Sequence, residues 1–154
     1  MGAVFFYHLT RNPLERTLPV LIEKALQAGW SVEVRGTQSD GLKDLDQSLW
    51  KTPEDGFLPH ALADTPEAEH SPVLLSLAPV IPPRNCIMSV HSATITPEEI
   101  NTAARVCVLF DGHDEAALHH ARQQWKSLTD AGCAAQYWSE ADGAWQKKAE
   151  ANAP

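Results

Sequence analysis

The segment FDGHDEAALHHAR, residues 110–122, contains the side chains best suited to catalysis. Asp111 follows an apolar run and precedes His113, and α/β enzymes place catalytic groups at the carboxyl ends of strands. Together with Asp114 and Glu115, these side chains could bind a metal ion or carry out acid and base chemistry. The same residues also fit a plain turn, because Asp-Gly is common turn chemistry and acids suit a helix start. The sequence favours the turn and keeps catalysis as an alternative.

Glycine motifs that bind phosphate are missing from the chain. Neither GxGxxG nor GxxxxGK[ST] occurs, and the segment HLTRNPLER, residues 8–16, has no glycine. Phosphates bind where glycines let the backbone approach at a helix N-terminus. The sequence therefore argues against a conventional dinucleotide or P-loop site.

A pair of cations lies on one face of an expected helix. Arg122 and Lys126 are four residues apart, with Leu118 one turn earlier and Trp125 alongside. The chain has 12 basic and 20 acidic residues, so a cation pair beside apolar groups fits a pocket for a carboxylate or a phosphate. The other interpretation is a solvated helix face whose charges pair with nearby acids.

Large apolar side chains also stand on a segment that neither a helix nor a strand of useful length can occupy. The segment SLWKTPEDGFLPHALAD, residues 48–64, places Trp50, Phe57 and Leu58 among two prolines and a glycine. These side chains either cap the end of the sheet as a small core or form a protein-binding patch. Aromatic anchors on a rigid loop suit an interface because little entropy is lost on docking.

The elements that position these residues follow from hydrophobic spacing. Apolar runs predict a strand buried on both faces at the start of the chain and further strands along it. Apolar residues at spacings of three and four predict helices between the strands, the first beginning near Leu18 because Pro19 fits only the first turn. The expected strands are residues 4–9, 31–34, 73–77, 86–90, 106–110 and, as an edge strand, 134–138.

Caps define the later helices. Thr96 has the chemistry of an N-cap and Pro97 suits the first helical position. A long helix is expected from about Asp114 to Ala131, with Gly132 ending it and a polar tail closing the chain. Alternating strands and helices predict a three-layer α/β/α Rossmann-like domain with a mainly parallel sheet, spanning residues 1–154.

Composition excludes several classes of protein. The net charge of −8 argues against a chain that coats itself on nucleic acid, and no apolar run approaches the roughly 20 residues that a membrane helix needs. The N-terminus lacks the features of a signal peptide, so we expect a cytoplasmic protein. Cys86, Cys107 and Cys133 are isolated from one another, which predicts free buried thiols.

Two stretches carry a resemblance to a known family. LDQSLWKTPEDGFLPHALA has the pattern Leu-Trp, then Pro, then Phe-x-Pro-His, and ARQQWKSLTDAG is followed by a late Trp, here Trp145. Both resemble the chi subunit of bacterial DNA polymerase III, and the resemblance extends over essentially the whole chain. The fold of that family agrees with the order of elements expected above.

The resemblance implies an accessory subunit of the replicase with no catalysis, metal or cofactor of its own. Such a subunit bridges the psi subunit of the clamp loader complex to the C-terminal tail of single-stranded-DNA-binding protein, so that it reaches DNA only indirectly. The psi-binding surface of the family carries over onto Trp50 and Phe57, to which we add the adjoining Leu58 and Pro59. Prolines would hold this loop rigid, which lowers the entropy lost on docking.

The tail-binding site of the family uses a basic residue for the terminal carboxylate and an apolar pocket for the last aromatic ring. Arg122 matches the key arginine, Lys126 the lysine one turn later, and Trp125 the aromatic position between them. Leu118 departs from the pattern, since some relatives have another basic residue there, so tail binding is expected to be weaker and less sensitive to salt. The alternative is a small α/β hydrolase that uses Asp111 and His113.

Overall fold

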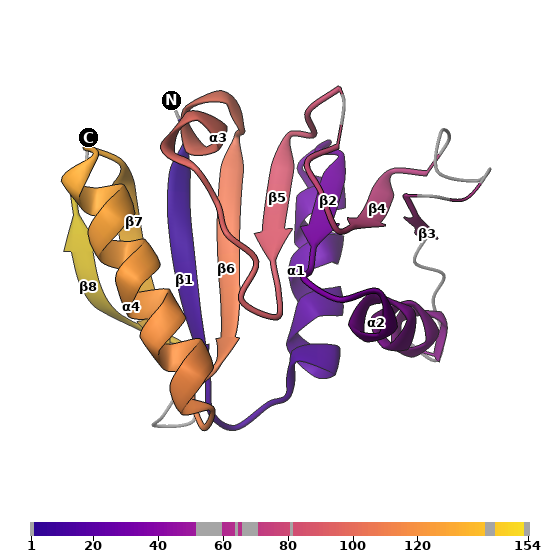
Figure 1. The fold of residues 1–154 in the computed structure, drawn as a ribbon, viewed down its shortest axis with the longest axis horizontal. Coiled ribbons are helices and arrows are strands. Elements are labelled where there is room, and N and C mark those ends of the chain that lie inside the picture. Colours follow the sequence, from indigo (N-terminus) through magenta and orange to yellow (C-terminus); the bar gives the residue numbers. More distant parts are fainter. Residues whose placement is uncertain are drawn as a thin grey trace.

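The computed structural model describes residues 2–51, 60–63, 65, 71–80, 82–140 and 144–152, apart from the side chains of Trp50 and Lys51. In these residues, eight strands form one sheet in the order β3-β4-β2-β5-β6-β1-β7-β8 (Figure 1). All neighbours are parallel except β7 and β8. The strands are β1 (Ala3–Leu9), β2 (Val32–Arg35), β3 (Ala61–Leu62), β4 (Val73–Ser76), β5 (Cys86–Ser89), β6 (Arg105–Asp111), β7 (Ala134–Ser139) and β8 (Gln146–Ala151).

Helices on both faces of the sheet produce two hydrophobic cores. The helices are α1 (Leu14–Gln27), α2 (Ser39–Lys51), α3 (Pro97–Thr102) and α4 (Glu115–Asp130). One core joins α1 and α2 to one set of alternate strand residues, and the other joins α3 and α4 to the opposite set. This confirms the predicted three-layer α/β architecture. None of the helices in the described residues is long and apolar enough to cross a bilayer.

The start of α1 differs from the prediction. The helix begins at Leu14 and therefore includes Pro19, which cannot donate to the carbonyl of Glu15. The prediction was wrong because it counted only the lost hydrogen bond. Leu18 and Ile22 are fully buried beside Pro19, and this packing offsets the loss.

The prediction that β1 is buried on both faces was right only in part, since Leu9 is buried on the α1 side but Phe5 and Tyr7 on that side are half-buried. Val4 and Phe6 are fully buried under the α4 side, whereas Phe5 and Tyr7 on the opposite face are half-buried. The reason is the placement of α1, which packs over β2 and β6 and leaves the sheet beyond β1 without a covering helix among the described residues.

The C-terminal part also corrects the prediction. Strand β7 is not at the edge, because β8 follows it and pairs with it antiparallel. The polar tail was not recognised as a strand, since Gln146 to Glu150 are exposed on both faces and show no apolar alternation. The two-residue β3 was not predicted either.

The residues that begin α3 and end α4 were predicted correctly. Thr96 and Glu99 form a capping box at α3, and Glu99 also accepts hydrogen bonds from the buried Arg35, which ties α3 to β2. Helix α4 ends before Gly132, whose φ of 91° lies in the left-handed region that favours glycine. The three cysteines are free and buried, as predicted.

The loop between β1 and α1 is held by a buried carboxylate. Oε1 of Glu140, just after β7, accepts hydrogen bonds from the backbone N–H groups of Thr10, Arg11 and Asn12 at 3.2, 3.0 and 2.9 Å. Oε2 accepts a further bond from the side chain of Asn12 at 3.1 Å. Burial alone raises the pKa of Glu140, but the hydrogen bonds from Asn12, Arg11 and Thr10 outweigh it and hold the pKa below its usual 4.5.

We expect Glu140→Gln to lower the free energy of unfolding by roughly 1–3 kcal/mol at neutral pH, because the amide keeps the shape but loses the charge that the backbone binds. The folded pKa is lowered, so the charge of Glu140 contributes stability above about pH 4.5, and this contribution disappears as the pH falls through the folded pKa. Urea unfolding of both proteins between pH 7 and pH 3 tests this.

The exposed Glu150→Gln serves as the control and should change stability little, since that side chain is 37% exposed. A Glu140→Gln variant as stable as the parent at pH 7, or a difference that does not shrink in acid, would contradict the role assigned to the carboxylate.

Candidate functional site

Helix α4 places the predicted cation pair on the surface. Asp114 caps the helix by accepting hydrogen bonds from the next turn, and Ala121 and Leu128 pack onto the sheet. Gln124 is buried and accepts a hydrogen bond from the backbone N–H of Ile95 at 2.8 Å. With this side facing the sheet, Arg122 is exposed on the flank of the helix that also carries Leu118 and Trp125.

An aromatic wall lies beside the helix. The ring of Trp125 packs edge-on against Phe6 with a centroid distance of 5.4 Å and against Tyr137 of β7 with a centroid distance of 6.0 Å. Trp125, Tyr137 and Leu118 are half-buried, so each has part of its surface open to solvent. We call Leu118, Arg122, Trp125, Lys126 and Tyr137 together the α4 face.

The base of the α4 face is fixed by hydrogen bonding. Nδ1 of His8 and the hydroxyl group of Tyr137 are 2.8 Å apart. The His8 ring lies so close to Gly112 that a Cβ there would meet Nε2 of His8 at 2.1 Å, which explains the glycine in the Asp-Gly turn. Any larger residue at Gly112 would displace the ring that orients Tyr137.

The charge of Arg122 acts on both of these rings. Burial raises the pKa of the Tyr137 hydroxyl, and the positive charge of Arg122 opposes this effect. Burial lowers the pKa of His8, and the charges of His113 and Arg122 lower it further. Arg122 also stands three residues before Trp125 in α4, which puts the two side chains on neighbouring positions of one helix face.

No acid neutralises the two cations within the described part of the chain. Neither Arg122 nor Lys126 forms an ion pair there, although the chain has more acidic than basic residues. A guanidinium that is exposed, unpaired by the described residues and next to aromatic rings can bind a carboxylate whose neighbouring side chain is apolar.

The loop with the predicted aromatic patch lies mostly outside the described residues. Phe57, Leu58 and Pro59 belong to the part that is not described, and Trp50 stands in the last turn of α2 with no described side chain. The described end of the loop is His60, which is buried, and its Nε2 lies 3.2 Å from the carbonyl oxygen and 3.1 Å from Oδ1 of Asp46 in α2. His60 thus anchors the return of the loop to α2.

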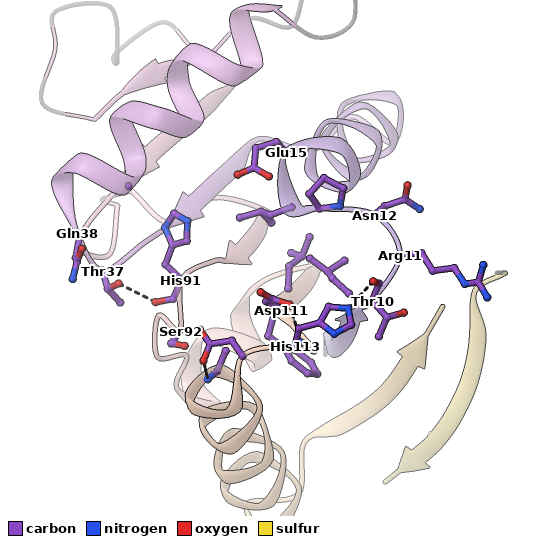
Figure 2. A pocket seen from close by; sticks show the side chains of 18 residues that line it. Thr10, Arg11, Asn12, Glu15, Thr37, Gln38, His91, Ser92, Asp111 and His113 are labelled. Atoms are coloured by element: carbon purple, nitrogen blue, oxygen red, sulfur yellow. Dashed lines mark hydrogen bonds between the residues drawn. The ribbon is translucent and has the colours of Figure 1, made fainter. Parts of the chain in front are cut away.

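The catalytic alternative lies in a separate crevice of about 790 Å³ at the carboxyl ends of β1, β2, β5 and β6 (Figure 2). Asp111 accepts a hydrogen bond from the backbone N–H of His113 at 2.8 Å, which closes the turn. Nε2 of His113 donates to the carbonyl oxygen of Thr10 at 2.8 Å, since a carbonyl only accepts. These contacts fit the turn interpretation and give the hydrolase alternative no support.

The described side chains also form no metal site. Among the described residues, no three His, Cys, Asp or Glu side chains are grouped as a metal site would require.

Spacing in the sequence predicted that four of the five residues of the α4 face lie close together, but it did not predict that Tyr137 joins them. Tyr137 and its partner His8 belong to neighbouring strands in the sheet but are 129 positions apart in the chain. The only signal was the alternation within AAQYWS, which puts Tyr137 on the same side as the buried Ala135. Using that signal requires the knowledge that β7 pairs with β1.

Comparison with known proteins identifies the family. A family model described as DNA polymerase III chi subunit, HolC, matches residues 1–136, which include α4 and end within β7. No curated protein sequence matches the chain significantly. The match covers well over half of the chain and confirms the resemblance seen in the sequence. The chain therefore belongs to the family of the chi subunit of DNA polymerase III, an accessory subunit in DNA replication.

Proposed function

We propose that this chain bridges two proteins of the replication machinery without catalysing a reaction itself. In this proposal the α4 face binds the C-terminal tail of single-stranded-DNA-binding protein. The loop with Trp50, Phe57, Leu58 and Pro59 binds the psi subunit of the clamp loader complex. Residues 1–154 then act as a single domain in the cytoplasm, in contact with DNA only through the tail-bearing partner.

The observation that carries the tail-binding half is the exposed guanidinium of Arg122 next to an aromatic wall. Arg122 has two parallel N–H groups for a terminal carboxylate, and no described acid competes for them. Trp125 and Tyr137 offer half-buried ring surface for the side chain that precedes that carboxylate. Lys126, one turn later and exposed, would steer an acidic tail toward the site.

The arrangement of the helices supports simultaneous binding of both partners. Helix α2, which leads into the aromatic loop, packs by β3 and β4, while α4 packs on the opposite face by β6 and β7. Two partners on these surfaces would not compete for space. A subunit that connects two proteins needs such a separation.

We expect Arg122→Ala to weaken binding of a fluorescent peptide with the C-terminal sequence of single-stranded-DNA-binding protein at least tenfold, or about 1.4 kcal/mol. Arg122→Lys should recover only part of this loss, because an ammonium group cannot bind a carboxylate in a bidentate manner. Fluorescence anisotropy at low salt measures both effects.

Lys43→Ala is the control, since it removes a cation from the exposed side of α2. Equal affinity for the parent and Arg122→Ala, or no binding by the parent, would refute the tail-binding site.

Leu118 offers a gain-of-function test. Leu118→Lys should tighten tail binding severalfold at low salt and make it more sensitive to salt, because a third cation joins the α4 face and its aliphatic stem can cover the apolar surface. The matched control is Ala116→Lys, which adds the same charge at an exposed position elsewhere on α4. The same anisotropy titration at two salt concentrations measures it. An affinity unchanged by Leu118→Lys, or an equal gain in both variants, would contradict the position of Leu118 at the site.

The other half of the proposal predicts a separate defect. Trp50→Ala combined with Phe57→Ala should abolish copurification with the psi subunit and leave binding of the tail peptide unchanged, because large aromatic anchors carry most of an interface's energy. Trp145→Ala is the aromatic control, since this partly exposed residue stands next to β8, at the other end of the sheet from β3. Wild-type copurification by the double variant would rule out the loop as the binding surface.

A further inference from the structure

A groove on the α1 side of the sheet remains without a function. It lies between α1 and the strands β1 and β7, has a volume of about 390 Å³, and is lined by aromatic residues from both ends of the chain. Tyr7, Trp138 and Trp145 line it from the sheet and the segment before β8, and Val20 lines it from α1. We call these four residues, with the cations described below, the aromatic groove.

The apolar surface of the groove is open to solvent. Val20 is 50% exposed and Trp145 is 36% exposed, and these are two of only three large apolar side chains exposed to this degree among the described residues. Trp145 packs edge-on against Tyr7 with a centroid distance of 5.4 Å. This contact with another residue of the groove orients the Trp145 ring. Adjacent exposed apolar side chains of this size are typical of interaction sites.

The rim of the groove is cationic. Arg16 and Lys24 lie four residues on either side of Val20, so all three form one stripe along α1, with the two cations about 12 Å apart. Among the residues that the structure describes, no acidic side chain lines the groove. Neither cation forms an ion pair with a described residue, although the chain carries a net charge of −8. The groove is therefore a positive apolar site on a negative protein.

The groove is separate from the α4 face. Trp138 and Tyr137 are neighbours in β7, and successive strand residues point to opposite faces of the sheet. Trp138 and Trp145 also follow residue 136, where the family match ends, so the groove is completed by a segment outside the matched residues. No residue of the α4 face belongs to the described lining of the groove.

We propose that the aromatic groove is a docking site for an acidic peptide segment of a partner protein that carries a large apolar side chain. The apolar side chain enters between Val20 and the tryptophans, and acidic residues on either side of it pair with Arg16 and Lys24. This site is independent of the tail-binding and psi-binding surfaces.

A peptide fits these observations better than a single strand of nucleic acid. Nucleic acid carries a charge on every nucleotide and needs a continuous cationic track, whereas the groove has two cations and the protein repels polyanions overall. The volume of the groove suits one or two large side chains, and the spacing of the two cations suits a few acidic residues around them.

The test uses the blocked peptide acetyl-Asp-Asp-Leu-Phe-Asp-Asp-amide, which lacks the terminal carboxylate that the α4 face would require. Titration into the 15N-labelled protein should shift the indole N–H signals of Trp138 and Trp145, which are assigned with Trp138→Phe and Trp145→Phe variants. The double variant Arg16→Glu and Lys24→Glu should weaken binding at least tenfold. Lys43→Glu, which makes the same change of charge on the exposed side of α2, should not weaken it.

Several results would overturn the proposal. They are an absence of indole shifts at millimolar peptide, equal affinity in the charge-reversed variant, or equal shifts with acetyl-Lys-Lys-Leu-Phe-Lys-Lys-amide. Tighter binding of a ten-residue oligothymidylate at the same indole signals would assign the groove to nucleic acid instead. Arg122→Ala should bind the blocked peptide as the parent does, so failure of this proposal and failure of the tail-binding proposal are distinguishable. Circular dichroism of each variant verifies that it is folded.

Discussion

The carboxylate of Glu140 connects the two ends of the chain and sets the geometry on which the surfaces of the protein depend. It binds three successive backbone N–H groups of the loop that leads from β1 into α1. In nucleotide-binding parallel α/β proteins the corresponding loop binds phosphates. Here the chain supplies the anion itself, from the residue that follows β7. This contact fixes the start of α1 against β7, and the aromatic groove lies between those two elements.

Much of the fold follows from local chemistry and could be predicted from the sequence. The caps at Thr96 and Asp114 and the stop at Gly132 depend only on residues within one turn of the helix end. Apolar runs identified β2, β4, β5 and β6 because those strands are buried on both faces. The failures occur where tertiary contacts outweigh local preference, as at Pro19, whose lost hydrogen bond is offset by packing.

The candidate sites were predicted in part for a related reason. Arg122, Trp125 and Lys126 share a helix, so their spacing alone shows that they lie together. Tyr137 joins them only because β7 pairs with β1, and strand order does not follow from the local pattern. The aromatic groove needs the same knowledge, since Tyr7 and Trp145 meet across 138 positions of sequence. Long-range pairing therefore marks the limit of what the residues reveal by themselves.

The two edges of the sheet have a consequence for how the protein behaves at high concentration. An edge strand presents free backbone groups that can pair with the edge of another molecule and begin aggregation. At one edge, β3 has only two residues and offers little to pair with. At the other edge, β8 carries Lys147, Lys148 and Glu150 at exposed positions. Charged side chains on an edge strand oppose pairing with the edge of another molecule. Both ends of the sheet therefore resist pairing with other copies of the chain, even though Val20 and Trp145 expose apolar surface elsewhere on the molecule.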